Sequence, residues 1–201
     1  MTLDDLLSLD KENIPQTAQK LTAQDLEELV GLLSEKDDKL RYPALLLLQS
    51  RSESFDDVYP YFDVFTGKLK SDNSFQRNIG LIMMAANARW DTHNKLDSSL
   101  DDYLGCVDDE KPITVRMGIQ ALENVVPYKP GLLERIARRL MQVDIGAQRS
   151  TMQKLILLDI LHVLIKIRRI KPSDDIDAYI SGALWGGVLD DKLKKQISKE
   201  L

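Results

Sequence analysis

The side chains best suited to metal binding or to nucleophilic catalysis are scarce in this sequence, which has two histidines and one cysteine among 201 residues. His93 and His162 stand 69 positions apart, and with Cys106 they offer no zinc-ligand spacing of the Cys-x-x-Cys or His-x-x-x-His kind. A cysteine nucleophile also needs a base and an orienting group, and no pattern around Cys106 supplies them. We therefore expect Cys106 to be a packing residue and His162 to be a satisfied imidazole in an apolar helix. No catalytic residue, metal or cofactor is predicted.

Carboxylates are the other candidate groups, because Asp-Asp pairs begin at positions 4, 37, 56, 101, 108, 174 and 190. Most pairs lie near expected helix N-termini, where carboxylates cap the helix and are favoured by its dipole. No EF-hand pattern of alternating acids and glycine occurs. The glycine-rich stretch SGALWGG, residues 181–187, lacks the order of a phosphate-binding loop. We interpret it as a loop between the last two helices.

The charge is distributed unevenly along the chain. The whole chain carries a net charge of −5, but residues 129–171 hold ten Lys or Arg against three Asp or Glu, a local net charge of +7. Such a segment could attract phosphates or an acidic protein surface, or it could simply cover the polar faces and C-termini of helices. The candidate binding residues are Arg135, Arg138, Arg139, Arg149, Lys166, Arg168 and Arg169.

The segments that would position these side chains have apolar residues at helical spacing, so helices are expected throughout. In DLEELVGLL, for example, Leu26, Leu29, Val30 and Leu33 follow the i, i+3, i+4, i+7 pattern of an amphipathic helix. Amphipathic segments of this kind alternate with four more apolar helices, each opened by a basic residue. An apolar residue follows each basic residue by six positions. The basic residues are Arg41, Arg77, Arg116 and Lys154, at intervals of 36, 39 and 38, and the apolar residues are Leu47, Met83, Leu122 and Ile160.

A period near 40 with two helices per unit is typical of helical solenoids. The sequence resembles the HEAT and armadillo type of α-solenoid through Arg41 with Ala44, Arg77 with Gly80, and VRMGIQAL at 115–122, each preceded by an acidic turn. The resemblance implies an all-α, right-handed α-α superhelix of about four hairpins, near 22–52, 55–89, 93–126 and 130–170. It also implies close helix approach at the small residue and a ladder of turn acids and helix bases that uses Arg41, Arg77, Arg116 and Lys154.

The domain organisation predicted from this pattern is a single domain over residues 1–201. Residues 1–21 form an N-terminal cap, 22–170 the repeats and 171–201 a C-terminal cap, because terminal repeats need a polar outer face. Acidic residues near the N-terminus argue against a targeting peptide, and the longest apolar stretch, residues 155–167, is too short for a membrane span. With a single cysteine and no possible internal disulfide, a cytoplasmic location is expected.

The predicted function is a non-enzymatic scaffold that binds a protein or peptide partner on the surface lined by the second helix of each hairpin. The alternative is a nucleic-acid-binding protein, because some DNA-repair glycosylases are built from HEAT-like repeats. Such an enzyme would use the basic segment, an aromatic side chain from Trp90 or Trp185, and Asp159 as its catalytic carboxylate. The acidic total charge makes nucleic acid the less expected partner, and no membrane partner is predicted.

Overall fold

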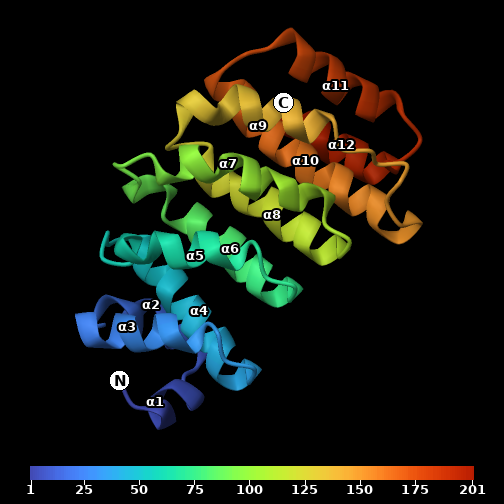
Figure 1. Ribbon diagram of the computed structural model, residues 1–201. Helices are drawn as coiled ribbons and strands as arrows, with labels where there is room; N and C mark the ends of the chain where they lie inside the picture. Colours follow the sequence, from blue (N-terminus) through green and yellow to red (C-terminus); the bar gives the residue numbers. More distant parts are fainter. The chain divides into compact units, whose positions relative to one another are not determined.

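The computed structural model describes residues 1–201 and is helical throughout, without β-strands (Figure 1). The all-α prediction is confirmed. No helix is both long enough and apolar enough to cross a membrane. The α-helices are α1 Leu3–Leu7, α2 Ile14–Gln19, α3 Ala23–Leu32, α4 Asp38–Ser52, α5 Phe62–Lys68, α6 Ser74–Ala86, α7 Lys95–Gly105, α8 Pro112–Val125, α9 Leu133–Met141, α10 Ser150–Ile170, α11 Asp174–Trp185 and α12 Asp191–Glu200.

Side-chain caps explain where several helices begin. Thr22 and Asp25 form the capping box of α3, in which each side chain bonds the other residue's backbone N–H. Asp37, Asn73 and Asp190 cap α4, α6 and α12, and each side chain accepts one bond from a backbone N–H of the first turn. Of the Asp-Asp pairs, those at 37 and 190 therefore supply caps, as the sequence predicts. Asp101 instead lies inside α7, and α11 begins at Asp174 without a side-chain cap.

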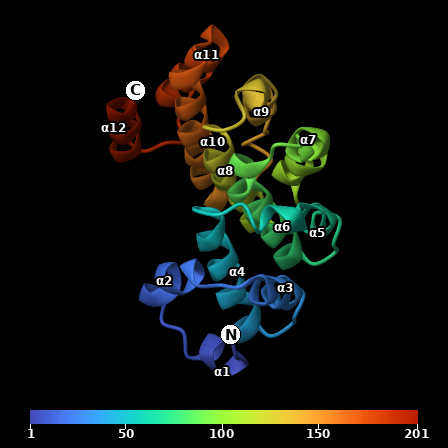
Figure 2. The same ribbon diagram turned by 90° about the vertical axis from the view of Figure 1, so that its left-hand side faces the viewer.

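The chain forms two compact units, Met1–Ser99 and Leu100–Leu201, and α7 contains the boundary between them. In the first unit α3 packs on α4, α5 packs on α6, and the two second helices α4 and α6 contact each other. Helix α2 also packs on α4, and Figure 2 shows α2 and α3 on opposite sides of it. The second helices therefore form the centre of this unit.

The second unit is built around α10. Helices α8 and α10 pack against each other, and α9, α11 and α12 all contact α10. Figure 2 shows α9 and α12 on opposite sides of α10. With 21 residues, α10 is the longest helix and holds this unit together.

The core consists of the apolar positions that recur in each second helix. Leu47, Met83, Leu122 and Ile160 are all fully buried, so the residue six positions after each repeated basic residue lies in the core. The register inferred from the sequence is confirmed at these positions. Burying an apolar side chain of this size stabilises the fold by about 1.5–3 kcal/mol.

Two details of the ends differ from the sequence interpretation. Residues 181–185 of SGALWGG belong to α11, which extends through Trp185, so the non-helical connection starts at Gly186. An exposed Trp and a single helical Gly do not stop a helix that is anchored by buried Ile176 and Ile180. Pro15 lies in the first turn of α2, one residue after the helix begins at Ile14, and does not interrupt it, since a proline there loses no helical hydrogen bond.

Gly80 marks a close contact between α6 and α5. A Cβ atom at this position would lie 2.7 Å from the backbone oxygen of Phe65 and 3.0 Å from Leu69 Cδ2. We expect Gly80→Ala to lower the free energy of unfolding by about 1–3 kcal/mol through overpacking. Gly67→Ala is the control, because a Cβ there meets nothing within 4 Å, and it should be neutral or slightly stabilising. Urea unfolding measures both, and equal effects would contradict the close approach.

The buried hydroxyl of Tyr59 should make the free energy of unfolding depend on pH in the alkaline range. Its hydroxyl donates to Asp91 Oδ1 at 2.7 Å, and burial followed by this bond raises the pKa of Tyr59 from 10.0 to about 12. Between these values the unfolded chain releases a proton that the folded chain keeps, so stability should fall as pH rises. In urea unfolding across that range, Tyr59→Phe should show a shallower decline than the wild type. Identical slopes would show that Tyr59 does not contribute.

Candidate functional site

The four repeated basic residues share a position in the sequence, near the start of a second helix, but they do not share a partner. Arg41 and Arg77 each donate from Nη1 to a carbonyl six residues earlier, that of Glu35 at 2.9 Å and that of Ser71 at 2.8 Å. These two arginines therefore hold the turn that leads into their own helix. Arg41 also pairs with Asp38, the acidic residue of its turn, which is the pairing of turn acid and helix base that the sequence predicts.

Arg116 binds a neighbouring helix instead. Its Nε donates to Asp159 Oδ2 at 2.6 Å and its Nη2 to Oδ1 at 3.2 Å, and Gln120 adds a bond to Oδ1 at 2.9 Å. The hydrogen bond to Asp159 raises the pKa of Arg116. Asp159 is only 5% exposed while the Arg116 side chain is 23% exposed, so α8 and α10 share an ion pair whose carboxylate is buried. Lys154 pairs with Asp190, the cap of α12, at 3.0 Å.

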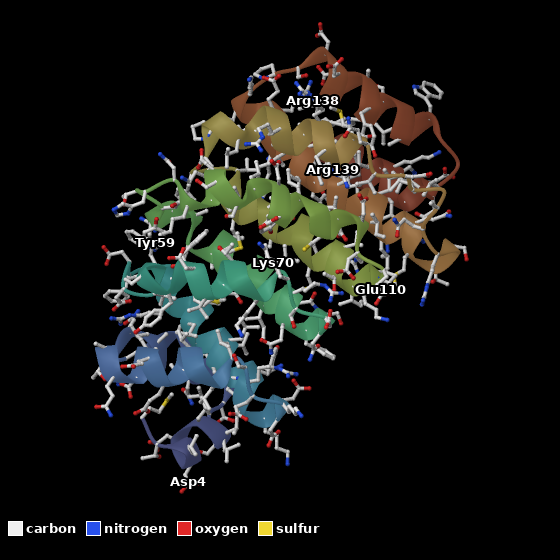
Figure 3. All side chains as sticks on the ribbon, in the orientation of Figure 1. Asp4, Tyr59, Lys70, Glu110, Arg138 and Arg139 are labelled. Carbon is white, nitrogen blue, oxygen red and sulfur yellow. The ribbon has the colours of Figure 1, made fainter.

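The basic segment, residues 129–171, is paired with carboxylates that come mainly from neighbouring elements of the second unit. Figure 3 shows two of its members, Arg138 and Arg139, on α9. Each exposed pair contributes at most about 1 kcal/mol to stability, but together the pairs cancel much of the local positive charge. The pairs are Arg135–Asp101, Arg138–Glu134, Arg139–Asp108, Lys166–Glu123, Arg168–Asp177 and Lys171–Glu134.

The seven candidate residues do not form one patch. Arg135, Arg138 and Arg139 lie on α9, while Lys166, Arg168 and Arg169 lie in the last turns of α10. Arg149 is exposed before the first residue of α10, roughly 30 Å from the far end of that helix given 1.5 Å per residue. Arg169 donates to the backbone oxygen of Glu200.

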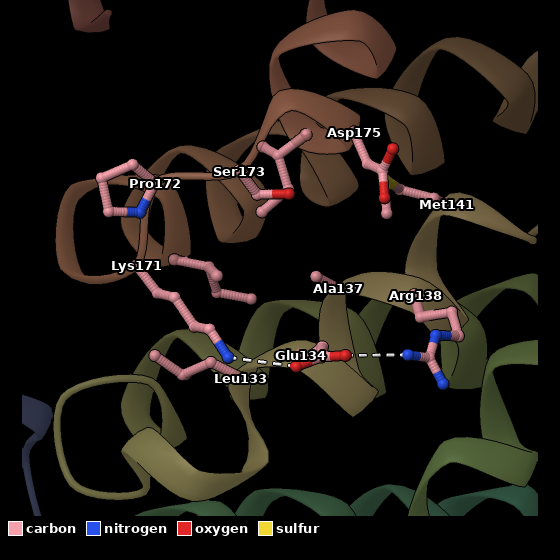
Figure 4. Close-up of a pocket in the computed structure, with 11 residues that line it drawn as sticks. Leu133, Glu134, Ala137, Arg138, Met141, Lys171, Pro172, Ser173 and Asp175 are labelled. Atoms are coloured by element: carbon pink, nitrogen blue, oxygen red, sulfur yellow. Dashed lines mark hydrogen bonds and ion pairs between the residues drawn. The ribbon is translucent and has the colours of Figure 1, made fainter.

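The structure does bring part of the segment to a cavity of about 240 Å³ between α9, the end of α10 and the start of α11 (Figure 4). Apolar side chains form much of its lining, and charged and polar side chains complete it. In Figure 4, Ser173 and Asp175 lie across the cavity from Glu134. The lining residues are Leu133, Glu134, Ala137, Arg138, Met141, Ile167, Lys171, Pro172, Ser173, Asp175 and Ile176.

Glu134 is the centre of the charged rim. It accepts from Lys171 Nζ at 3.1 Å and from Arg138 Nη2 at 2.9 Å. The hydrogen bond from Lys171, together with both positive charges, lowers the pKa of Glu134. The rim therefore carries alternating positive and negative groups that could hydrogen-bond to a peptide, around an apolar floor.

The sequence interpretation placed Arg138 in the binding set but missed Glu134, Met141, Lys171, Asp175 and the apolar floor. The i, i+4 spacing of Glu134 and Arg138 is visible in the sequence and predicts their ion pair. The approach of α11 is not visible, because its N-terminus lies beside α9 only through tertiary packing.

The remaining candidate catalytic residues are held in structural contacts. His162 is only half-buried, and its Nε2 lacks a hydrogen bond and lies 3.7 Å from a carboxylate oxygen of Glu200, so the expectation of a satisfied buried imidazole is wrong. His93 stacks on Tyr59 with ring centroids 6.1 Å apart. Trp90 donates to the backbone oxygen of Ser52 at 2.7 Å.

Two buried cations of the first unit were not predicted from the sequence. Arg51 donates to the carbonyls of Ala18 and Gln19 at the end of α2 and pairs with Asp57. Lys68 Nζ donates to Ser34 Oγ at 3.0 Å and to Gln76 Oε1 at 2.5 Å, and burial lowers the pKa of Lys68. Arg51 reaches carbonyls 32 and 33 residues away and Lys68 reaches a hydroxyl 34 residues away, so local sequence patterns do not reveal these contacts.

Comparison with known proteins bears on the fold. No protein-family model matches the sequence, and a search of curated proteins finds no match. Among solved structures, the chain is similar to the crystal structure of an engineered protein determined as a Northeast Structural Genomics Consortium target, with a TM-score of 0.61 and 15% identity. The similarity covers 100% of this chain and 95% of that chain. At this identity it concerns the fold alone.

Proposed function

We propose that the chain is a non-enzymatic protein-binding module of the HEAT-like solenoid type, and that it binds a partner at the cavity between α9, α10 and α11. The observation that carries the proposal is the combination of an apolar floor with a rim of alternating charges. Binding surfaces commonly have this composition, with an apolar centre for an anchoring side chain and a polar edge.

The solenoid part of the proposal is supported by the repeated helix pairs. Helices α3, α5 and α9 pack on the second helices α4, α6 and α10, and α4 contacts α6 as α8 contacts α10. The basic residues at intervals of 36, 39 and 38 all lie near the starts of α4, α6, α8 and α10. These contacts support a stack of helical hairpins.

The size of the cavity favours a protein side chain as its occupant. A volume of about 240 Å³ is below the roughly 300–1,000 Å³ typical of small-molecule sites. One large apolar side chain of a partner could fill it, and the rim groups Lys171, Glu134 and Asp175 could bind the partner's flanking polar groups. Nothing in this role requires a reactive group.

The experiment compares proteins captured from the native cell by wild type and by three variants. Ala137→Met fills the cavity, and the matched control Ala178→Met adds the same side chain at an exposed position of α11. A partner captured by wild type and by the control, but not by Ala137→Met, would support the proposal. Lys171→Glu, an exposed rim change that leaves the core untouched, should weaken the same capture. Equal recovery with all four proteins would contradict it.

The nucleic-acid alternative is less well supported. Five of the seven candidate residues pair with carboxylates, and the sixth, Arg169, bonds to a backbone oxygen. Both oxygens of Asp159, the proposed catalytic carboxylate, accept bonds from Arg116 or Gln120. A group held in this way is poorly placed to act on a base.

We expect no binding of duplex DNA at physiological salt, because the unpaired positive charge is small and the chain is acidic overall. Fluorescence anisotropy across a salt series measures this. Binding at micromolar concentration, with log affinity falling by about 0.9 per phosphate contact against log salt and lost in Arg138→Glu with Arg139→Glu, would favour the alternative.

A further inference from the structure

A second cavity, of about 470 Å³, lies in the first unit between α1 and α3. It is separate from the α9–α11 site in sequence and in its lining. Leucines from both helices form its apolar surface, and carboxylates surround them. The residues that line it are Met1, Thr2, Leu3, Leu6, Asp25, Glu28, Leu29, Gly31, Leu32 and Glu35.

Gly31 is the informative residue of this groove. It lies in α3, where glycine is less stable than alanine by about 1 kcal/mol. Its backbone does not require glycine, since no glycine of the chain has a positive φ, and an added Cβ would meet nothing within 4 Å. Neither conformation nor internal packing explains a glycine here. Gly67 in α5 is open in the same way, so what sets Gly31 apart is its place in the lining of this cavity, where the bare backbone lets a partner side chain approach α3 closely.

The charge of the groove identifies the kind of molecule. Its lining includes the carboxylates of Asp25, Glu28 and Glu35, and Asp25 is paired with the α-ammonium of Met1, so the remaining negative charge comes from Glu28 and Glu35. Glu28 and Glu35 are exposed, and they stand on either side of Gly31 in the sequence. Helix α1 adds Asp4 and Asp5, and Figure 3 shows Asp4 on this helix. The surface is therefore complementary to positive charge.

The apolar surface beside the groove is only partly covered. In α1 only Leu6 is buried, while Leu3 and Leu7 remain more than half exposed. Covering exposed leucines beside an apolar cavity removes apolar surface from water, which favours binding of a partner.

We propose that the α1–α3 groove binds a basic amphipathic helix of a partner protein. An apolar side chain of that helix packs over Gly31 and into the leucine-lined cavity, and its Lys or Arg residues pair with Glu28 and Glu35. This mode is the insertion of a helix into a groove, with apolar residues as anchors and charges that set its orientation. The proposal concerns a different surface from the α9–α11 cavity, so the failure of either leaves the other intact.

The test uses a fluorescein-labelled amphipathic peptide of repeating Lys-Leu-Leu-Lys units, with a Glu-Leu-Leu-Glu peptide as the charge control. We expect the Lys peptide to bind wild type, and binding to weaken as salt increases. Gly31→Leu should weaken binding by about tenfold or more, and Glu28→Gln with Glu35→Gln by about tenfold. Gly67→Leu, which alters an exposed helical glycine of the same unit away from the groove, should leave binding unchanged.

Several results would overturn the proposal. These are absence of Lys-peptide binding at near-millimolar protein, equal binding of the Glu peptide, or binding that Gly31→Leu does not change. Analytical ultracentrifugation of the protein without peptide tests whether a second copy of the chain occupies the groove instead. If Gly31→Leu abolishes self-association of the wild type, the groove is covered by a second copy of the chain and the basic-helix proposal is wrong.

Discussion

Replacing Arg116 with methionine is expected to lower the free energy of unfolding by about 3–5 kcal/mol, because it leaves the buried Asp159 carboxylate without its cation. Asp159 would keep only the bond from Gln120, at 2.9 Å. The double variant Arg116→Met with Asp159→Leu removes both charges and should recover most of the loss. Urea unfolding of the two single variants and the double variant gives the coupling between the two side chains.

The control for this cycle is Arg138→Met. Arg138 forms an exposed pair with Glu134, at 2.9 Å, in which both side chains are more than half exposed. Its removal should change stability by no more than about 1 kcal/mol. If Arg116→Met lowered the free energy of unfolding no more than Arg138→Met, the prediction that an unpaired, buried Asp159 is strongly destabilising would be wrong.

Leu47→Ala and Met83→Ala should each lower the free energy of unfolding by about 2–5 kcal/mol, since both side chains are fully buried and alanine leaves a cavity. Leu7→Ala provides the comparison, because Leu7 is 52% exposed and should lose well under about 1 kcal/mol. Thermal or urea unfolding measures all three. Losses below about 1 kcal/mol at both buried positions would show that the repeat register is wrong.

The helices were predictable because their signals are local. The capping box of Thr22 and Asp25 and the i, i+3, i+4, i+7 pattern after it place α3, and Gly80 lies where two helices approach closely. Boundaries that depend on tertiary packing were less predictable. Helix α11 continues through Trp185 because Ile176 and Ile180 anchor it, although the glycines around Trp185 favour a loop.

The candidate site was harder to predict because its chemistry depends on partners far away in the sequence. The excess of positive charge in residues 129–171 left open a surface for phosphates or an acidic protein and a simple covering of helix faces. In the structure Arg135 pairs with Asp101 and Arg139 with Asp108, more than 30 residues earlier. The composition of a segment gives its net charge, but it does not show which carboxylates from other helices lie beside it. The cavity beside Glu134 likewise requires α11 to pack near α9, and no spacing in the sequence predicts that contact.

Hydrogen bonds between helices join residues at moderate sequence separation, which affects the rate and order of folding. The Gln76 to Leu33 bond in the first unit and the Arg116 to Asp159 bond in the second each close a loop of 43 residues, a small part of the chain. Loops of this size cost little entropy to close, and helical proteins with local contacts fold in microseconds to milliseconds. A ribosome adds only about 5–20 residues per second. The segment Met1–Ser99 can therefore begin to fold before synthesis of the second unit is complete.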